Sequence, residues 1–397
     1  MNTKIILFLI LGIDVLNLVL QTSELSISYY EASLLYGGFS PLQYIVKTSI
    51  SIFGQNDFSL RLPMIMLHLF GTLLLYKISN KYIDNERNRL WLIFIYVLLP
   101  GIISSAIIVD SAGLVLFGLL FFIYMYQNFS KTILYPLLSI YIFLDGGFLF
   151  LFLALSLFAI KEKDKKFFIF NTASFFTSLY LYGINTHGAP KGHFLDSIGI
   201  YATIFTPILF IYIFYSLYRK YLNKDMDILW YISSTALIVS LLLSFRQRIH
   251  VEHFAPYLIV ALPVMAQVFI HSYRVRLKIF RKRYRVIFII TLVFLFINSS
   301  VVFFNKYLYP VMDNPKKHFA YKMHVAKELS RKLKSMGVNC LESDEKMSKR
   351  LKFYNVTKCN NYILLENNLN SSIRSNVTIS YKNRLVYKAN VTKININ

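Results

Sequence analysis

The chain has 397 residues, of which 56% are hydrophobic and only 16% charged, and its mean hydropathy is +0.50. These values exclude an ordinary soluble domain and a disordered chain, because both carry a larger polar fraction. The formal net charge is +23, yet we do not predict nucleic-acid binding. Much of the excess lies in one loop, residues 274–285, where basic side chains anchor a membrane topology on anionic lipid.

Apolar stretches recur from residue 5 to residue 304, each near the roughly 20 residues that a helix needs to cross a bilayer. We therefore predict an all-α polytopic membrane domain, residues 1–304, with eleven transmembrane helices. The predicted helices span 5–22, 63–79, 90–107, 111–127, 132–144, 148–160, 167–184, 200–218, 228–245, 256–273 and 287–304. The first is retained, because it holds Asp14 and lacks a small-residue cleavage site.

The stretches 132–144 and 148–160 are short, and we interpret them as a hairpin that turns at Asp145-Gly-Gly. With this hairpin, the basic loops lie on the side of the N-terminus. The exceptions before residue 305 are Lys47, Arg61, Lys191, Arg246 and Arg248. The positive-inside rule then predicts a cytoplasmic N-terminus and an extracytoplasmic C-terminal segment, as in a bacterial inner-membrane protein.

The first outer loop, residues 23–62, is the longest polar interval near the start of the chain. It predicts two short interfacial helices, around Tyr29–Tyr36 and Leu42–Phe53, and places Pro63 in the first turn of the next span. Asp110 lies between two spans with almost no loop, so its carboxylate is at or below the membrane surface. Such a group needs a partner or a function, or it caps the following helix.

From residue 305 charged and Asn-rich segments replace the apolar stretches, which predicts a small basic α/β domain, residues 305–397. Its predicted elements are a helix His318–Met336 ended by Gly337, a strand Val338–Leu341, a helix Glu345–Tyr354, a strand Tyr362–Leu365 and a hairpin within Thr378–Ile396. Cys340 and Cys359 are the only cysteines. They form either a disulfide or two buried thiols, and the sequence leaves both open.

Several pieces of the first third match a known pattern. They are Tyr29-Tyr-Glu31, Ser40-Pro-Leu42, Ile52-Phe-Gly54, Leu60-Arg-Leu-Pro63 and Asp110. Together they resemble the membrane glycosyltransferases of the GT-C fold, most closely the branch of protein O-mannosyltransferases and lipid A aminoarabinose transferases. The resemblance implies a polyprenyl-phosphate-linked sugar as donor, a lipid, glycan or protein acceptor, an outer-face site and inversion at the anomeric carbon.

By the same resemblance Glu31 is the candidate general base and Asp110 the second catalytic acid. A base must take the acceptor proton while cations balance the leaving phosphate. The candidate phosphate-binding cations are Arg61, Lys191, Arg246 and Arg248, because arginine suits bidentate phosphate contacts.

The family commonly has an Asp-Glu pair before the tyrosines, where this chain has Ser26-Ile-Ser28. Three alternatives follow: the base is Glu31, the base is Glu24, or the chain is a GT-C-like scaffold without the usual activity. A lipid-linked glycan carrier or transporter is the rival function. The outer loops hold His187, His193, His250 and His253, but no carboxylate stands at ligand spacing, so a divalent metal is unsupported.

Overall fold

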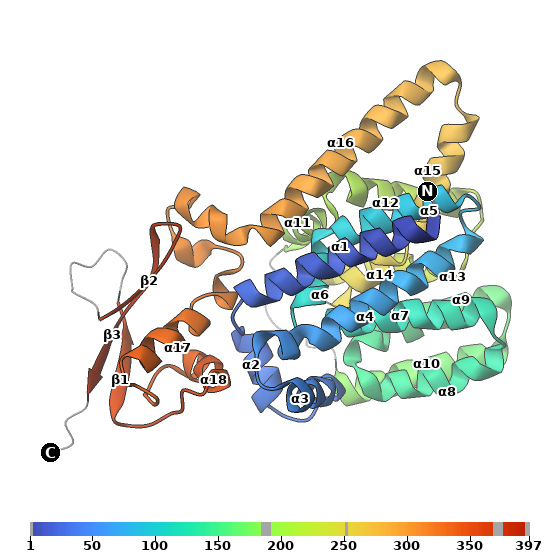
Figure 1. Ribbon diagram of the computed structural model, residues 1–397. Coiled ribbons are helices and arrows are strands. Elements are labelled where there is room, and N and C mark those ends of the chain that lie inside the picture. Colours follow the sequence, from blue (N-terminus) through green and yellow to red (C-terminus); the bar gives the residue numbers. More distant parts are fainter. Residues whose placement is uncertain (1–2, 184–191, 251–252, 368–375, 394–397) are drawn as a thin grey trace. The chain divides into compact units, whose positions relative to one another are not determined.

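The computed structural model describes residues 3–183, 192–250, 253–367 and 376–393, and the rest of this account concerns those residues (Figure 1). They fold into many helices and a small C-terminal sheet. The helices are α1 Thr3–Glu24, α2 Tyr29–Tyr36, α3 Pro41–Phe53, α4 Asp57–Ile78, α5 Glu86–Leu98, α6 Pro100–Ile107, α7 Ser111–Asn128, α8 Lys131–Leu144, α9 Leu149–Glu162, α10 Lys165–Tyr182, α11 Phe194–Phe205, α12 Pro207–Leu222, α13 Ile228–Ser244, α14 Ala255–Ile259, α15 Leu262–Val275, α16 Lys278–Phe303, α17 Ala326–Ser335 and α18 Glu345–Phe353. The strands are β1 Tyr362–Glu366, β2 Val377–Tyr381 and β3 Arg384–Lys393.

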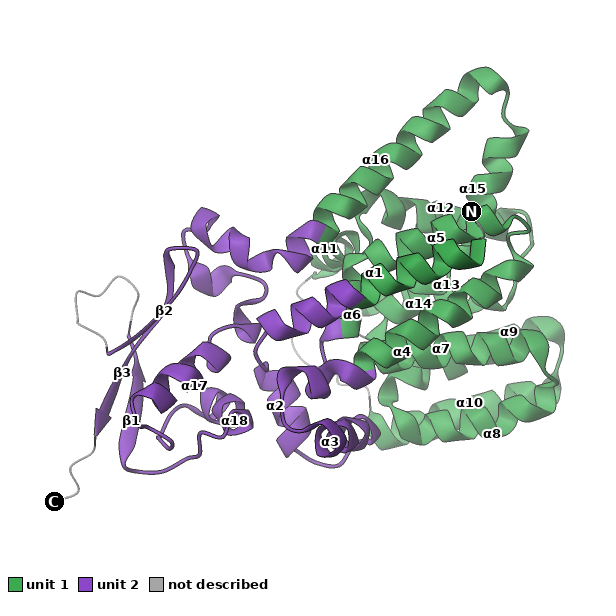
Figure 2. Ribbon diagram, in the orientation of Figure 1, with its two compact units in different colours: residues 1–15, 64–106, 110–299 green, residues 16–63, 107–109, 300–397 purple. Residues whose placement is uncertain are grey.

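The chain divides into two compact units, shown in different colours in Figure 2. Unit 1 comprises residues 1–15, 64–106 and 110–299, and unit 2 comprises residues 16–63, 107–109 and 300–397. Each unit is described by itself below. The first outer loop therefore belongs to the same compact unit as the C-terminal segment, a division that differs from the predicted boundary at residue 304.

The described parts of the eleven predicted apolar stretches are mainly helical, with breaks at Leu99, at Thr206 and at residues 260–261. Among the described residues, five helical stretches are long and apolar enough by themselves to cross a membrane. The number rises to seven if α5 with α6, bent by 63°, and α11 with α12, bent by 104°, each count as one broken span. The molecule thus has the helices of a membrane protein.

Helices α8 and α9 form the predicted hairpin. The Asp145 carboxylate accepts a hydrogen bond from the Gly147 amide at 2.7 Å and closes the turn. Lys131 at the start of α8 pairs with Asp164, just beyond the end of α9, at 2.9 Å. One continuous helix could not bring these two residues together, because they would lie about 50 Å apart at ~1.5 Å per residue.

The ends of several unit 1 helices meet through polar contacts. The Tyr82 hydroxyl donates to Asp227 at 2.6 Å, and the Lys161 ammonium donates to the Met226 carbonyl at 2.7 Å. These segments, with the Lys131–Asp164 pair, are the loops that the positive-inside rule assigns to one side. The contacts bring these helix ends together, and the side of the membrane on which they lie stays a prediction.

A buried polar pair links α1 to α4 within unit 1. The Asp14 carboxylate lies 2.7 Å from His68 Nε2, and both side chains are almost fully buried. The His68 ring stacks on Tyr96 with centroids 5.8 Å apart. A carboxylate among apolar helices requires such a partner, because an unpaired buried charge is costly.

Helix α4 starts at Asp57, six residues before Pro63, so the prediction that Pro63 lies in the first turn is wrong. Proline lacks an amide hydrogen and leaves the carbonyl four residues earlier without its helical donor. That carbonyl belongs to Ser59, and the Ser49 hydroxyl of α3 donates to it at 2.6 Å. The missing helical bond is thereby replaced by a contact between α3 and α4.

The C-terminal part of unit 2 is an antiparallel sheet in the order β1-β3-β2 with α17 and α18. The hairpin β2–β3 turns at Lys382 and Asn383, which both have positive φ, 48° and 64°. This pair of left-handed residues is typical of the two-residue turns that match strand twist. The predicted terminal hairpin is confirmed for residues 377–393, and its last residues lie outside the described chain.

Two predicted elements of this part are wrong. The helix expected over His318–Met336 begins only at Ala326, because Val325 has φ 79° and ψ −56° and the Ala326 amide bonds to the His324 carbonyl at 3.0 Å. This is a γ-turn, which a helix cannot contain. The expected strand Val338–Leu341 is reduced to an isolated parallel bridge between Cys340 and Thr357.

Cys340 and Cys359 form a disulfide with Cα atoms 5.4 Å apart, which decides between the two alternatives left open by the sequence. The bond joins the segment before α18 to the segment after it. It therefore closes a loop around that helix.

Candidate functional site

The candidate site is built around α2 in unit 2. Ser28 caps this helix: its hydroxyl accepts from the Glu31 amide at 3.2 Å, and the Glu31 carboxylate accepts from the Ser28 amide at 2.8 Å. This reciprocal capping box satisfies two amides that would otherwise lack partners at a helix start. It also fixes the direction of the Glu31 side chain.

Glu31 is fully buried and uses both carboxylate oxygens. Oε2 also lies 3.3 Å from Arg61 Nη2, and Oε1 accepts from the Val109 amide at 3.2 Å. Glu31 thus connects α2 with α4 and with the segment 107–109. In this structure the carboxylate supports the fold and does not face solvent.

Arg61 completes the buried pair and is itself fully buried. Its guanidinium lies 3.5 Å from the Thr22 carbonyl in the last turn of α1, and it donates to the carbonyls of Leu25 at 3.2 Å and Ser26 at 3.0 Å just beyond that helix. Carbonyls at a helix end have no intrahelical donor, so an arginine that reaches them stabilises the helix end. Arg61 is therefore a cap for α1 as well as the partner of Glu31.

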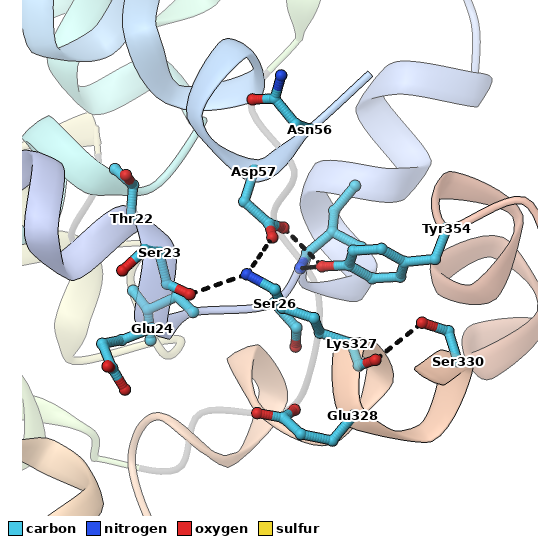
Figure 3. A network of polar contacts seen from close by, with 12 residues as sticks. Thr22, Ser23, Glu24, Ser26, Asn56, Asp57, Lys327, Glu328, Ser330 and Tyr354 are labelled. Atoms are coloured by element: carbon cyan, nitrogen blue, oxygen red, sulfur yellow. Dashed lines mark hydrogen bonds and ion pairs between the residues drawn. The ribbon is translucent and has the colours of Figure 1, made fainter. Parts of the chain in front are cut away.

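Asp57, which the sequence analysis did not select, is a second centre of the polar network (Figure 3). Its carboxylate pairs with Lys327 Nζ at 2.7 Å and accepts from the Tyr354 hydroxyl at 2.6 Å. Lys327 also donates to the Ser23 carbonyl at 2.8 Å. Asp57 lies 4.0 Å from Arg61 Nη1, one helical turn along α4. This i, i+4 spacing of acid and arginine was the sequence signal that could have identified it.

The backbone of residues 26–28 is held by α18. The Arg350 side chain donates to the Ile27 carbonyl at 2.9 Å, and the Ile27 amide donates to the Tyr354 hydroxyl at 2.9 Å. Burial lowers the pKa of Arg350, and burial together with the Asp57 charge raises the pKa of Tyr354. The segment Ser26-Ile-Ser28 is thus fixed by two side chains of unit 2, the buried Arg350 and the partly buried Tyr354.

Glu24 is the exposed acid of this loop. Its carboxylate pairs with Lys306 Nζ at 2.7 Å, and its side chain is 57% exposed. Of the two candidate bases, Glu24 is accessible and Glu31 is not. Lysines of unit 2 also lie over the loop tyrosines: Lys322 over Tyr30 at 5.1 Å and Lys352 over Tyr36 at 4.4 Å.

The other predicted site residues belong to unit 1. Asp110 is the N-cap of α7, and its carboxylate accepts from the Ala112 amide at 2.9 Å. Arg246 and Arg248 follow α13 and are exposed. Lys191 and His187 lie outside the described residues. The structure thus brings Glu31 and Arg61 together within unit 2, and the convergence of both with Asp110 and the two arginines stays a prediction.

Within the described chain no group of three His, Cys, Asp or Glu side chains is arranged to hold a metal ion. His250 and His253 are neighbours, with ring centroids 6.3 Å apart. A pair of imidazoles without a third donor does not complete the ligand set of a zinc site.

Comparison with known proteins gives no relatives: no protein-family model matches the chain, and no curated protein matches it significantly.

Proposed function

We propose that this protein is a membrane glycosyltransferase of the GT-C type. It transfers a sugar from a polyprenyl-phosphate donor to a lipid, glycan or protein acceptor at the outer face of the membrane, with inversion at the anomeric carbon. The proposal rests on the resemblance of the first third of the chain to that family.

The observation that carries the proposal is the assembly of unit 2. Glu31 and Arg61 belong to two of the matching motifs and are 30 residues apart in the sequence. Their side chains form an ion pair at 3.3 Å. Ser40 and Pro41, from another matching motif, form the start of α3. The Ser40 hydroxyl is the N-cap and accepts from the Gln43 amide at 3.1 Å, and Pro41 is the first residue of the helix. An acid-bearing loop built on a rigid frame is a suitable platform for a site.

The proposed topology has eleven crossings, a cytoplasmic N-terminus and unit 2 outside the cytoplasm. The Cys340–Cys359 disulfide supports the placement of unit 2, because disulfides persist in oxidising compartments. Exposed apolar side chains of α3, among them Tyr44, Ile52 and Phe53, support an interfacial position for this helix.

In the proposed mechanism an outer-face carboxylate takes the proton of the acceptor nucleophile as that nucleophile bonds to the anomeric carbon. The bond from this carbon to the phosphate oxygen breaks, and the lipid phosphate leaves. Asp110 and either Glu31 or Glu24 are the acids. Arg246 and Arg248, with Lys191, balance the charge that develops on the leaving phosphate. Arg61 acts through Glu31, because its two Nη groups donate to that carboxylate and to carbonyls at the end of α1.

A second candidate function is a non-catalytic GT-C-like scaffold or lipid-linked glycan carrier. The burial of Glu31 favours it, since a general base must reach the proton that it removes, and every oxygen of this carboxylate has a structural partner.

The test is complementation of a deletion strain, with the cell-envelope glycans and lipids profiled by mass spectrometry. Asp110→Asn and Glu24→Gln are compared with Glu31→Gln, which keeps a side chain able to complete the capping box. We expect Asp110→Asn to lower the glycan product at least 100-fold at normal expression. A profile restored equally by all three single variants and by the triple variant would reject the transferase and favour the scaffold.

A further inference from the structure

A cavity of about 360 Å³ lies in unit 1 at the end of α7 that is opposite Asp110. Over 18 residues, α7 separates the two positions by about 27 Å. The cavity is therefore distinct from the proposed transferase site. It is lined by Tyr76, Lys77, Asn80, Lys81, Arg89, Tyr124, Gln127 and Asn128.

The lining is basic and contains no acid. Lys77 and Lys81 are exposed, and Lys77 lies over the Tyr124 ring at 5.4 Å. Arg89 is 8% exposed, and Glu86, 3.5 Å away, is the acid that the described structure pairs with it. Lys77, Lys81 and Arg89 thus give the cavity walls a net positive charge, which the single carboxylate of Glu86 does not balance.

Two donors of the lining lack an acceptor in the described structure. They are Arg89 Nε and Gln127 Nε2, both buried. The rest of the Arg89 guanidinium is fixed, since it donates to Asn80 and lies 5.1 Å from the Tyr76 ring. A buried donor without an acceptor destabilises the folded protein, so a ligand whose oxygens accept hydrogen bonds in this cavity would satisfy both donors.

Basic residues at and just after the end of α4 could serve only to offset the dipole of that helix, which favours cations at its C-terminus. That explanation accounts for Lys77 and leaves Arg89 unexplained, because Arg89 lies in the first turn of α5, where the dipole disfavours a cation. The helix dipole also provides no hydrogen-bond acceptor for Gln127 Nε2.

We propose that this cavity binds the phosphate group of an anionic ligand. Arginine and lysine are the side chains that recognise phosphate, and the volume lies within the range of small-molecule sites. The phosphate belongs to a lipid headgroup or to a soluble phosphate ester. Basic pockets between membrane helices suit the first source, and the test separates the two.

The experiment uses the full chain purified in neutral detergent. The probes are dioleoylphosphatidylglycerol, zwitterionic dioleoylphosphatidylcholine, glycerol 3-phosphate and inorganic phosphate, and binding is measured by native mass spectrometry and by the shift of the thermal midpoint. The cavity variant is Lys77→Gln with Lys81→Gln. The matched control is Lys165→Gln with Lys166→Gln, which removes two exposed lysines of α10 in the same unit. A third variant, Gln127→Leu, removes one unpartnered donor without a change of charge.

We expect saturable binding of phosphatidylglycerol, weakened roughly 30-fold by the cavity variant and less than twofold by the control. Gln127→Leu weakens binding roughly fivefold. If glycerol 3-phosphate or inorganic phosphate binds as tightly, with the same dependence on the variants, the site holds and its ligand is soluble. Equal loss in the control, equal affinity for phosphatidylcholine, or no saturable binding of any probe would overturn the proposal.

Discussion

Glu31 illustrates how a residue chosen for chemistry can have a structural task. Its place beside two tyrosines made it the candidate base, while Ser28 and Glu31 at N-cap and N3 also form a capping-box pattern in the sequence. The structure has the capping box, and Arg61 and the Val109 amide occupy the remaining acceptors. A catalytic role requires the Glu31 carboxylate to be accessible, whereas the structural role buries it. The spacing of residues in the sequence does not specify which of the two holds.

At the same scale, Asp57 should stabilise unit 2. The Asp57 side chain is almost fully buried and is the partner of both the Lys327 ammonium and the Tyr354 hydroxyl. Asp57→Ala leaves both groups without this partner. We expect a loss of about 3 kcal/mol in the free energy of unfolding of unit 2. Limited proteolysis of the full-length protein during denaturation measures it. Asp313→Ala, at an exposed carboxylate of the same unit, is the control and should cost below about 0.5 kcal/mol. Equal losses would contradict the role of the network.

His324 predicts a pH dependence. Burial and the nearby charges of Lys306, His318 and Arg350 lower its pKa to about 3, so the folded protein keeps it neutral while the unfolded chain, with a pKa near 6.5, gains a proton. Stability contributed by this group is complete above about pH 6.5 and is lost as the pH falls toward 3. The expected slope is about 1.4 kcal/mol per pH unit for one proton.

The measurement for His324 is the unfolding free energy between about pH 6.5 and pH 5, where most exposed carboxylates remain charged. His324→Gln should flatten the slope by about one proton, and the buried His318 should retain a smaller contribution, because burial also lowers its pKa. An unchanged slope in the variant would show that His324 is protonated in the folded protein.

At the scale of elements, α4 shows how a proline inside a helix is accommodated. Ser49→Ala removes the donor to the Ser59 carbonyl, which Pro63 cannot satisfy. We expect a loss of about 1–3 kcal/mol, measured as a fall in the thermal midpoint. The double variant Ser49→Ala with Pro63→Ala restores a helical donor and should recover most of it. Thr48→Ala, on an exposed hydroxyl of the same helix, is the control.

In the C-terminal part, some secondary-structure elements are determined by the local sequence and others by contacts between distant residues. Strand β1, helix α18 and the β2–β3 hairpin follow from periodicity and turn chemistry, and the structure contains them. The start of α17 does not follow, because the γ-turn at Val325 is held from outside: the Tyr381 hydroxyl accepts from the Val325 amide at 3.2 Å. A contact between residues 56 positions apart has no signature in a local pattern.

For the whole molecule, the disulfide links stability to compartment. Its two cysteines are 19 residues apart, so reduction should lower the stability of unit 2 by about 3 kcal/mol. Cys340→Ala with Cys359→Ala should have the same midpoint with and without dithiothreitol, whereas the wild-type midpoint should fall. Alkylation of intact cells with a membrane-impermeant maleimide should label the wild-type protein only after reduction. Labelling before reduction would place free thiols in the folded protein and contradict the proposed location.

The sequence by itself determined the helical membrane class, the positions of the apolar helices, the α8–α9 hairpin and the basic C-terminal segment. Those features depend on composition, hydrophobic length and turn residues, all of which are local. Tertiary structure alone decided that the first loop and the C-terminal segment form one unit, that Glu31 is buried against Arg61, that Asp57 joins Lys327 and Tyr354, and that Arg89 lines a basic cavity. Burial and pairing of charges depend on residues distant in the chain, so they become defined only when the helices pack.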